Sequence, residues 1–280
     1  MKNTQSEKNV YLTENVNESE RLKLQVNAAK YADSILKKNI LEFIIKKQNG
    51  PITFLDAGCG PCHISEELQK LFPQMIFQCI DNSEDRVKKA QARLSNEPNI
   101  HIEQGDVVNL QEDDNSYDVV FSRFVLDHLK QQQQQIVDGF FKILKPGGII
   151  ILQSVDHGLG IHYPEDVYLG IIKQQLYKKL HENNYDPNTG RCLKALVGRS
   201  GFELVRQPII ELYKLYSFPL DEKEFKAYRI KLENGFPFFV KAFGNHNKAE
   251  DAMKYLLDYV QRPGSMTYSI SVLIVAQKLQ

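Results

Sequence analysis

A short apolar run near residue 55 ends in an acid and two glycines. Residues 52–55 are mostly apolar, and the chain continues with the pattern Asp-x-Gly-x-Gly. Glycine permits a tight strand-to-helix turn and lets bare backbone approach a ligand closely. Such a corner of an α/β sheet suits an adenosyl ligand. We expect this ligand to contact Asp56, Ala57, Gly58, Cys59 and Gly60.

The same turn contains the tetrapeptide Cys59-Gly60-Pro61-Cys62, which offers a second kind of chemistry. A Cys-x-x-Cys beside a strand–helix–strand pattern can be a redox dithiol, and these four letters match the active site of the thioredoxins. Thioredoxin-like chains are much smaller and normally place Trp before the first Cys. Here Gly58 precedes it, and the chain has no Trp. A dithiol oxidoreductase is therefore the less favoured alternative.

Two further acids follow the next two apolar runs. Asp81 lies 21 residues after Gly60 and directly follows the run 75–80. An acid at this distance, at the end of the second strand, accepts hydrogen bonds from ribose hydroxyls. Asp106 follows the run 100–103 and is placed to accept from an adenine amino group. Alternatively, Asp81 could cap a helix and Asp106 could be a turn residue. Further ligand contacts are expected from Asn82, Gly105, Val107, Ser122, Arg123 and Phe124.

Strands and helices that alternate along the chain must position these residues. The apolar runs predict five strands, over 52–55, 75–80, 100–103, 117–122 and 149–153, with helices over 64–72, 83–94 and 136–144. This repetition is typical of a mostly parallel sheet with helices on both sides. Three later segments, 202–205, 209–215 and 268–276, look extended and suit an antiparallel sheet edge. We predict a Rossmann-like, doubly wound, seven-stranded α/β sheet with an antiparallel last strand, N-terminal helices and a helical cap.

The chain divides into six predicted segments. Segments outside the sheet are expected to cover the carboxyl ends of its strands, where ligands bind in such folds. The predicted segments are an N-terminal helical cap (1–48), a ligand-binding core (49–155), a cap insertion (156–200), a core strand (201–218), a second cap insertion (219–263) and the last core strand (264–280).

The series of motifs resembles the class I S-adenosylmethionine-dependent methyltransferases of the bacterial small-molecule type. The resemblance rests on Asp-x-Gly-x-Gly, Asp81, Asp106, the run 121–129 and Lys-Pro-Gly-Gly at 145–148. It implies S-adenosylmethionine as cofactor and methyl transfer to a nitrogen or oxygen of a small molecule. It also implies an N-terminal helix that closes over the cofactor, with Tyr11 and Arg21 near the methionine end. A non-catalytic S-adenosylmethionine-binding protein is the main alternative.

The same loop argues against a nicotinamide enzyme. The dinucleotide fingerprint needs a third glycine, and this chain has His63 at that position. For methyl transfer, a neutral amine acceptor needs no base, whereas a hydroxyl needs a His or a carboxylate. The candidate bases are His128 and His157, which follow the fourth and fifth strands. We expect no metal, because neither a second cysteine or histidine pair at zinc spacing nor a clear acidic cluster is present.

The composition limits the class of partner. Thirty-five basic and 35 acidic residues cancel over 280 residues, which argues against nucleic-acid binding. The chain has no secretory leader pattern and no run of 18 apolar residues, so we expect no membrane partner. Four cysteines are too few for a disulfide scaffold, and a reducing cytoplasm is the expected location. We expect a small-molecule substrate and a monomer or homodimer.

Overall fold

The computed structural model describes residues 50–279. The predicted N-terminal cap, including Tyr11 and Arg21, lies outside the described residues. Among the described residues, one sheet runs through the molecule in the order β3-β2-β1-β4-β5-β8-β6, and β7 also pairs with β8. Its strands are β1 (Thr53–Ala57), β2 (Ile76–Asp81), β3 (Ile100–Gln104), β4 (Tyr117–Arg123), β5 (Leu144–Tyr163), β6 (Phe202–Leu204), β7 (Ile209–Ser217) and β8 (Met266–Lys278).

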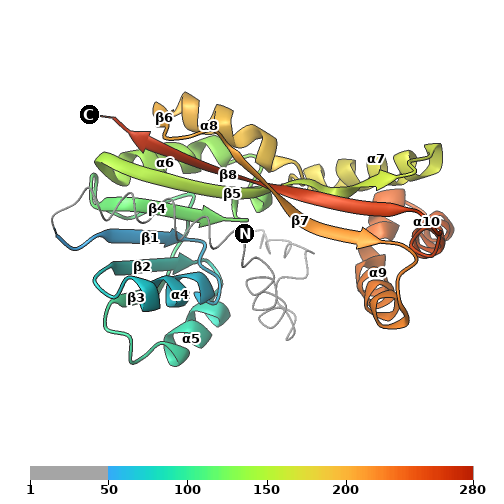
Figure 1. Cartoon of the computed structure of the whole chain (residues 1–280), viewed down its shortest axis with the longest axis horizontal. Coiled ribbons are helices and arrows are strands. Elements are labelled where there is room, and N and C mark those ends of the chain that lie inside the picture. Colours follow the sequence, from blue (N-terminus) through green and yellow to red (C-terminus); the bar gives the residue numbers. More distant parts are fainter. Residues whose placement is uncertain (1–49, 280) are drawn as a thin grey trace, which may run out of the picture.

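The sheet is parallel from β3 to β5 and reverses at β8 (Figure 1). Both β6 and β7 run antiparallel to β8. β6 pairs with residues 276–278 and β7 with residues 266–273, so the two lie end to end along one edge of β8. Eight strands thus fill seven positions, which confirms the predicted seven-stranded, mostly parallel sheet.

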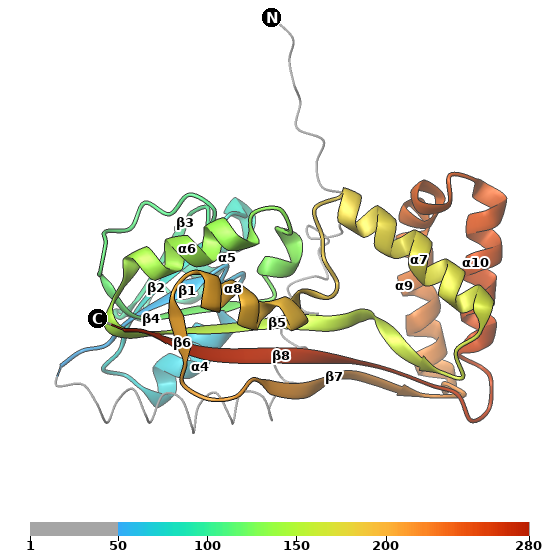
Figure 2. The same ribbon diagram turned by 90° about the horizontal axis from the view of Figure 1, so that it is seen from above.

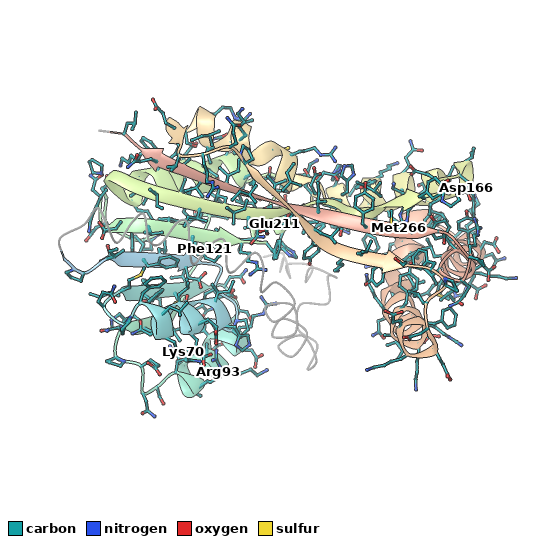
Figure 3. The ribbon with its side chains drawn as sticks, in the orientation of Figure 1. Lys70, Arg93, Phe121, Asp166, Glu211 and Met266 are labelled. Atoms are coloured by element: carbon teal, nitrogen blue, oxygen red, sulfur yellow. The ribbon has the colours of Figure 1, made fainter. Side chains whose placement is uncertain are left out.

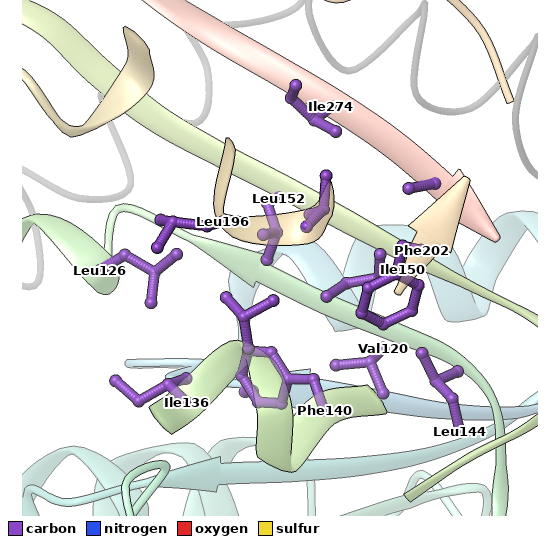
Figure 4. Packing of buried hydrophobic residues seen from close by; sticks show 14 of the residues in the cluster. Val120, Leu126, Ile136, Phe140, Leu144, Ile150, Leu152, Leu196, Phe202 and Ile274 are labelled. Atoms are coloured by element: carbon purple, nitrogen blue, oxygen red, sulfur yellow. The ribbon is translucent and has the colours of Figure 1, made fainter. Parts of the chain in front are cut away.

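Helices cover both faces of this sheet and bury an apolar cluster on each. On one face lie α4 (His63–Leu71) and α5 (Glu84–Arg93), whose Leu68 and Ala90 pack with Phe54 and Phe77. The other face carries α6 (Gln133–Ile143) and α8 (Leu193–Arg199). Figure 4 shows Phe140 and Leu196 of these helices facing the strand residues of the second cluster. Because strand side chains alternate between faces, each central strand contributes to both clusters.

Local signals set the element boundaries in the core. Ser83 caps α5, since its Oγ accepts a 3.5 Å hydrogen bond from the backbone N of Arg86. Lys145 of the Lys-Pro-Gly-Gly segment donates a 2.9 Å hydrogen bond to Oδ2 of Asp118. The same Oδ2 accepts a 2.9 Å hydrogen bond from the backbone N of Thr53. This segment therefore ties the start of β5 to β1 and β4.

The main departure from prediction is the length of β5. We predicted a strand over 149–153, but β5 extends to Tyr163 and pairs with β8 from Ile149↔Gln277 to Tyr163↔Met266. Residues 157–160 contain two glycines and predict a loop. Hydrogen bonding to β8 nevertheless continues beyond them, with a register shift between Asp156 and Ile161. A tertiary partner here overrides local propensity.

Beyond the core, β5, β8 and β7 continue as a three-stranded ribbon that ends at a helical unit (Figures 1 and 2). This unit consists of α7 (Val167–Glu182), α9 (Glu222–Phe243) and α10 (His246–Tyr259). It has a separate apolar core in which Ile172 of α7 packs with Phe239 of α9 and Leu256 of α10. The unit lies on the side of the sheet toward which β1 and β4 point. The predicted division into six segments stays a prediction.

None of the helices between residues 50 and 279 is long and apolar enough to cross a membrane.

Candidate functional site

The loop after β1 is fastened to the end of β2. The backbone N of Gly58 donates a 2.8 Å hydrogen bond to the carbonyl O of Ile80. The backbone N of Gly60 donates a 2.8 Å hydrogen bond to Oδ2 of Asp81. Both motifs that the sequence singled out therefore meet at one corner of the sheet, at the carboxyl ends of two neighbouring parallel strands.

Gly58 is required by its surroundings as well as by its backbone angle. Its φ is +79°, a conformation that residues with a Cβ rarely adopt. A Cβ at this position would overlap Cγ2 of Val125, which lies in the loop after β4. The two loops thus approach each other through bare backbone. This is the kind of surface against which a flat adenosyl group can lie.

Asp81 holds the loop and retains capacity to bind a ligand. Its side chain is 5% exposed. Oδ1 accepts a 3.0 Å hydrogen bond from the backbone N of Ser83, and it lies 3.8 Å from Nη1 of Arg86. Oδ2 accepts from Gly60, as described above. Because a carboxylate has about four acceptor positions, two backbone donors leave room for the hydroxyls of a ribose.

Asp56 is turned toward helix α4. It is 3% exposed, and its Oδ2 accepts a 2.5 Å hydrogen bond from Oγ of Ser65. Burial raises the pKa of the Asp56 carboxyl well above its ordinary value, an effect strengthened by Cys79. This side chain anchors the loop to α4, and its predicted contact with the ligand stays a prediction.

The third predicted acid, Asp106, closes a turn after β3. Its Oδ1 accepts a 2.9 Å hydrogen bond from the backbone N of Val108, and its Oδ2 accepts from Nδ2 of Asn109 at 3.0 Å. Gly105 donates its backbone N to the carbonyl O of Asp81 at 3.1 Å, so this turn adjoins the end of β2. The other predicted contacts differ in exposure, since Val107 is buried and Asn82 is exposed.

The segment after β4 brings aromatic and basic side chains to the same edge. Ser122 donates its Oγ to the carbonyl O of Ala57 at 2.9 Å. Phe124 has a φ of +55°, and its ring lies 5.2 Å from the ring of Tyr213 on β7. The guanidinium of Arg123 lies 4.9 Å from the centre of the Phe124 ring. The predicted group 122–124 therefore lies beside β1, and β7 adds an aromatic ring.

Sequence reasoning missed the contribution of the C-terminal strands. Gln153 of β5 donates its Nε2 to Oγ of Ser271 at 3.0 Å and to Oε2 of Glu211 at 3.3 Å. Gln153 also accepts, through its carbonyl O, a 2.8 Å hydrogen bond from the backbone N of Phe124. Figure 3 shows Glu211 on β7, near the middle of the molecule. The available signal was a Gln that ends the buried run Ile-Ile-Ile-Leu.

The two candidate bases lie in separate clusters. The His128 ring packs edge-on against Tyr185, with the ring centres 4.9 Å apart. His157 has a φ of +54° at the register shift of β5, and its Nε2 lies 3.1 Å from Nη2 of Arg191. The same Arg191 nitrogen lies 2.7 Å from Oδ1 of Asp156. A catalytic role for either histidine stays a prediction.

Within residues 50–279, no group of three or more His, Cys, Asp or Glu side chains is arranged to hold a metal ion.

The sheet order, the reversed β8 and the glycine loop beside Asp81 define the fold of the class I S-adenosylmethionine-dependent methyltransferases. Residues 54–148 match the family model described as a methyltransferase domain. These residues therefore form a class I S-adenosylmethionine-dependent methyltransferase domain. For these residues the predicted class I family, methyltransferase enzyme class and cofactor, S-adenosylmethionine, are confirmed, whereas the bacterial small-molecule type stays a prediction.

Named relatives match the chain over only part of their length. A malonyl-[acyl-carrier protein] O-methyltransferase of Bacillus cereus is 31% identical over 124 residues, which are 44% of this chain and 43% of that protein. An uncharacterized 37.1 kDa protein in a transposon of Streptomyces fradiae is 33% identical over 150 residues, which are 53% of this chain and 42% of that protein. The chain spans less than half the length of both relatives.

Solved structures share the fold at low sequence identity. A provisionally named methyltransferase from Bacillus halodurans matches with a TM-score of 0.56 and 16% identity, covering 86% of this chain and 100% of that one. A [4+2]-cyclase matches with a TM-score of 0.51 and 16% identity, covering 86% of this chain and 80% of that one. At such identities the likeness establishes the fold alone.

Proposed function

We propose that this protein transfers the methyl group of S-adenosylmethionine to a nitrogen or oxygen of a small-molecule acceptor by in-line displacement. The observation that carries the proposal is the hydrogen bond from Gly60 to Asp81, which joins the glycine loop to the acid at the end of β2. The family match of residues 54–148 supports the same chemistry.

The described residues fit the cofactor. A Cβ at Gly58 would fill the space between two loops, and Asp81 keeps acceptor capacity for ribose hydroxyls. When bound, the cofactor supplies an activated methyl carbon on a cationic sulfur. The protein positions both reactants and excludes water. The rings of Phe124 and Tyr213 already lie against the cations of Arg123 and Lys214, each 4.9 Å from a ring centre, so we assign no contact with the cofactor sulfur to these rings.

A small molecule is the proposed acceptor, and a nucleic acid or a membrane is not. The net charge of zero lacks the electrostatic footprint of a nucleic-acid binder. The helical unit lies beyond the carboxyl ends of β1 and β4, at the far end of the ribbon of β5, β8 and β7. If the acceptor is a hydroxyl, His128 or His157 is the proposed base, whereas a neutral amine needs none. We further propose a cytoplasmic monomer or homodimer.

Calorimetry with S-adenosylmethionine and S-adenosylhomocysteine tests the cofactor part of the proposal. Both should bind at one site per chain. Release of S-adenosylhomocysteine is then measured against panels of small carboxylic acids, alcohols and amines, and turnover with a member of one panel identifies the acceptor atom. Binding of neither compound would refute the proposed function.

One fold neighbour favours a second candidate. Because the [4+2]-cyclase shares this fold, a protein can keep the cofactor-binding architecture and perform chemistry other than methyl transfer. Under this alternative the chain binds S-adenosylmethionine without consuming it. Tight binding, together with no S-adenosylhomocysteine release across all three panels, would favour the non-methylating candidate.

A further inference from the structure

Three thiols gather beneath the loop that we assign to the cofactor. Cys59 and Cys62 stand at the two ends of a tight turn, closed by a 3.0 Å hydrogen bond from the backbone N of Cys62 to the carbonyl O of Cys59. Cys79 lies on β2, opposite Asp56 in the strand register. The backbone N of Cys59 donates to the carbonyl O of Ile80, the residue after Cys79, at 3.0 Å.

These thiols differ in access to solvent. Cys62 and Cys79 are completely buried in the apolar cluster beneath α4, with an exposure of 0%. Cys59 packs against the same cluster but is partly exposed. A reagent from solvent would therefore meet Cys59 first, and the other two sulfurs lie behind it.

Hydrogen bonding links the three sulfurs. Hydrogen bonds from the thiols of Cys59 and Cys62 lower the pKa of Cys79 well below its ordinary value. The same contacts, first with Cys62 and then with Cys79, raise the pKa of Cys59. The turn also brings the Cα atoms of Cys59 and Cys62 within the separation that a disulfide needs, because the ends of a β-turn lie less than about 7 Å apart.

Cys62 adopts a backbone conformation that costs energy. Its φ is +56°, in the left-handed region, at the N-cap position directly before α4. This conformation is unfavourable for a residue with a Cβ, and glycine avoids most of that cost. The Cys62 side chain makes no capping hydrogen bond to the helix, so capping does not explain a cysteine at this position. Strain of this kind is concentrated at functional positions.

We propose that Cys59 and Cys62 form a modification site, at which a peroxide oxidises the pair to a reversible disulfide that weakens cofactor binding. The Cys59 sulfur, once deprotonated, attacks one peroxide oxygen, and the O–O bond breaks with release of hydroxide. The resulting sulfenic acid is attacked by the Cys62 sulfur, and water leaves. In total two thiols lose two electrons and two protons, and one hydrogen peroxide becomes two waters. A dithiol reductant restores both thiols.

The disulfide would act on the loop between its two cysteines. Gly60 lies inside the closed ring, and its backbone N donates to Asp81. A disulfide fixes the two sulfurs at about 2.05 Å with a restricted torsion angle, a constraint that the turn does not carry when both thiols are free. The Gly60–Asp81 hydrogen bond and the bare backbone around it then leave their cofactor-binding positions. This consequence rests on the proposed function, whereas formation of the disulfide does not.

Peptide mapping of the full-length protein after hydrogen peroxide treatment tests the site. Trypsin leaves Cys59 and Cys62 together in peptide 48–70 and places Cys79 in peptide 71–86. We expect peptide 48–70 to lose two hydrogens and to regain them with dithiothreitol. Free thiols after treatment, or a bond to Cys79 or Cys192 instead, would overturn the proposal.

Two variants serve as controls. Cys62→Gly suits the left-handed backbone, should fold, and should leave peptide 48–70 without an internal disulfide. Cys192→Ser removes a cysteine on the other face of the sheet and should leave the oxidation unchanged.

Calorimetry on the reduced and oxidised protein tests the consequence. We expect the oxidised form to bind S-adenosylmethionine at least ten-fold more weakly, with recovery on reduction. Equal affinity in both forms would overturn the coupling between the disulfide and the loop. If the reduced protein binds no cofactor, the proposed function fails, and the peptide map still decides whether the disulfide forms.

Discussion

The backbone N of Gly60 donates a hydrogen bond to the Asp81 carboxylate, although 21 residues separate them in the chain. One acid thus fixes the shape of the glycine loop, and it is also the proposed acceptor for a ribose. If Asp81 has both roles, the spacing between the two motifs is fixed by the loop as well as by the ligand.

Replacement of Asp81 should weaken cofactor binding much more than replacement of an exposed acid does. Hydrogen bonds to charged groups contribute about 1.5–3 kcal/mol each, so Asp81→Ala is expected to weaken S-adenosylmethionine binding by roughly 10–150-fold. Calorimetry on folded protein measures this. Asp85→Ala is the matched control, because Asp85 is exposed and pairs only with Lys89 among the described residues. A change of less than two-fold for Asp81→Ala would contradict its role.

Gly58→Ala should destabilise the protein as well as the site. The added methyl meets Val125 and enforces a left-handed backbone on alanine, and overpacking typically costs about 1–3 kcal/mol. Thermal unfolding provides the measurement. Gly235→Ala in helix α9, where an added Cβ meets nothing within 4 Å, should instead stabilise by about 0.5–1 kcal/mol. Similar melting temperatures for both variants would show that the loop tolerates a side chain.

Because of Asp127, we expect the free energy of unfolding of the protein to depend on pH. It is 1% exposed, and neither carboxyl oxygen meets a donor at full hydrogen-bond geometry among the described residues, although Val155 and Thr189 lie near enough to oppose part of the pKa shift. Burial raises the pKa of Asp127 well above its ordinary value. The native state therefore binds the proton more tightly than the unfolded chain does. The contribution of Asp127 to the free energy of unfolding is largest below its unfolded pKa of about 3.9. It falls as the pH rises from there toward the raised native value.

Asp127→Asn should remove this dependence. Denaturant unfolding between pH 4 and pH 8 is expected to show that the variant gains stability relative to the wild type as the pH rises. Asp85→Asn, which changes an exposed acid, should give a curve parallel to the wild type. Parallel curves for Asp127→Asn as well would mean that this carboxyl does not titrate abnormally.

Asp118 should be a stability residue without a role in cofactor binding. Its Oδ2 accepts from the backbone N and Oγ1 of Thr53 and from Nζ of Lys145, at 2.8 to 2.9 Å. Asp118→Ala removes the acceptor of the Thr53 backbone N and one acceptor each of Thr53 Oγ1 and Lys145 Nζ, and it should cost about 2–4 kcal/mol. Asp114→Ala breaks only an exposed ion pair with Lys142 and should cost less than about 1 kcal/mol. Denaturant unfolding compares the two, and cofactor affinity should stay within two-fold of wild type in both.

Much of the parallel half of the fold was predictable because its signals are local. The apolar run before Asp81 marks a largely buried strand, the alternation before Asp106 marks the edge strand β3, and Ser83 marks a helix start. The antiparallel half was harder, because β5 resumes its pairing with β8 at Ile161, beyond two glycines that have no partner in β8. The hydrogen bond from Gln153 to Glu211 was equally hard to predict. Its position depends on strand register across β8, which no short sequence pattern records.

The continuous ribbon of β5, β8 and β7 has a mechanical consequence. No flexible linker joins the helical unit to the core within residues 144–163 or 266–278, since both segments are paired strand along most of their length. Reorientation of the unit must therefore bend or shear a hydrogen-bonded ladder, a stiffer deformation than rotation about a loop. Compliance is concentrated at the register shift between Asp156 and Ile161, where the ladder is interrupted. We therefore expect the ribbon to bend at this interruption first.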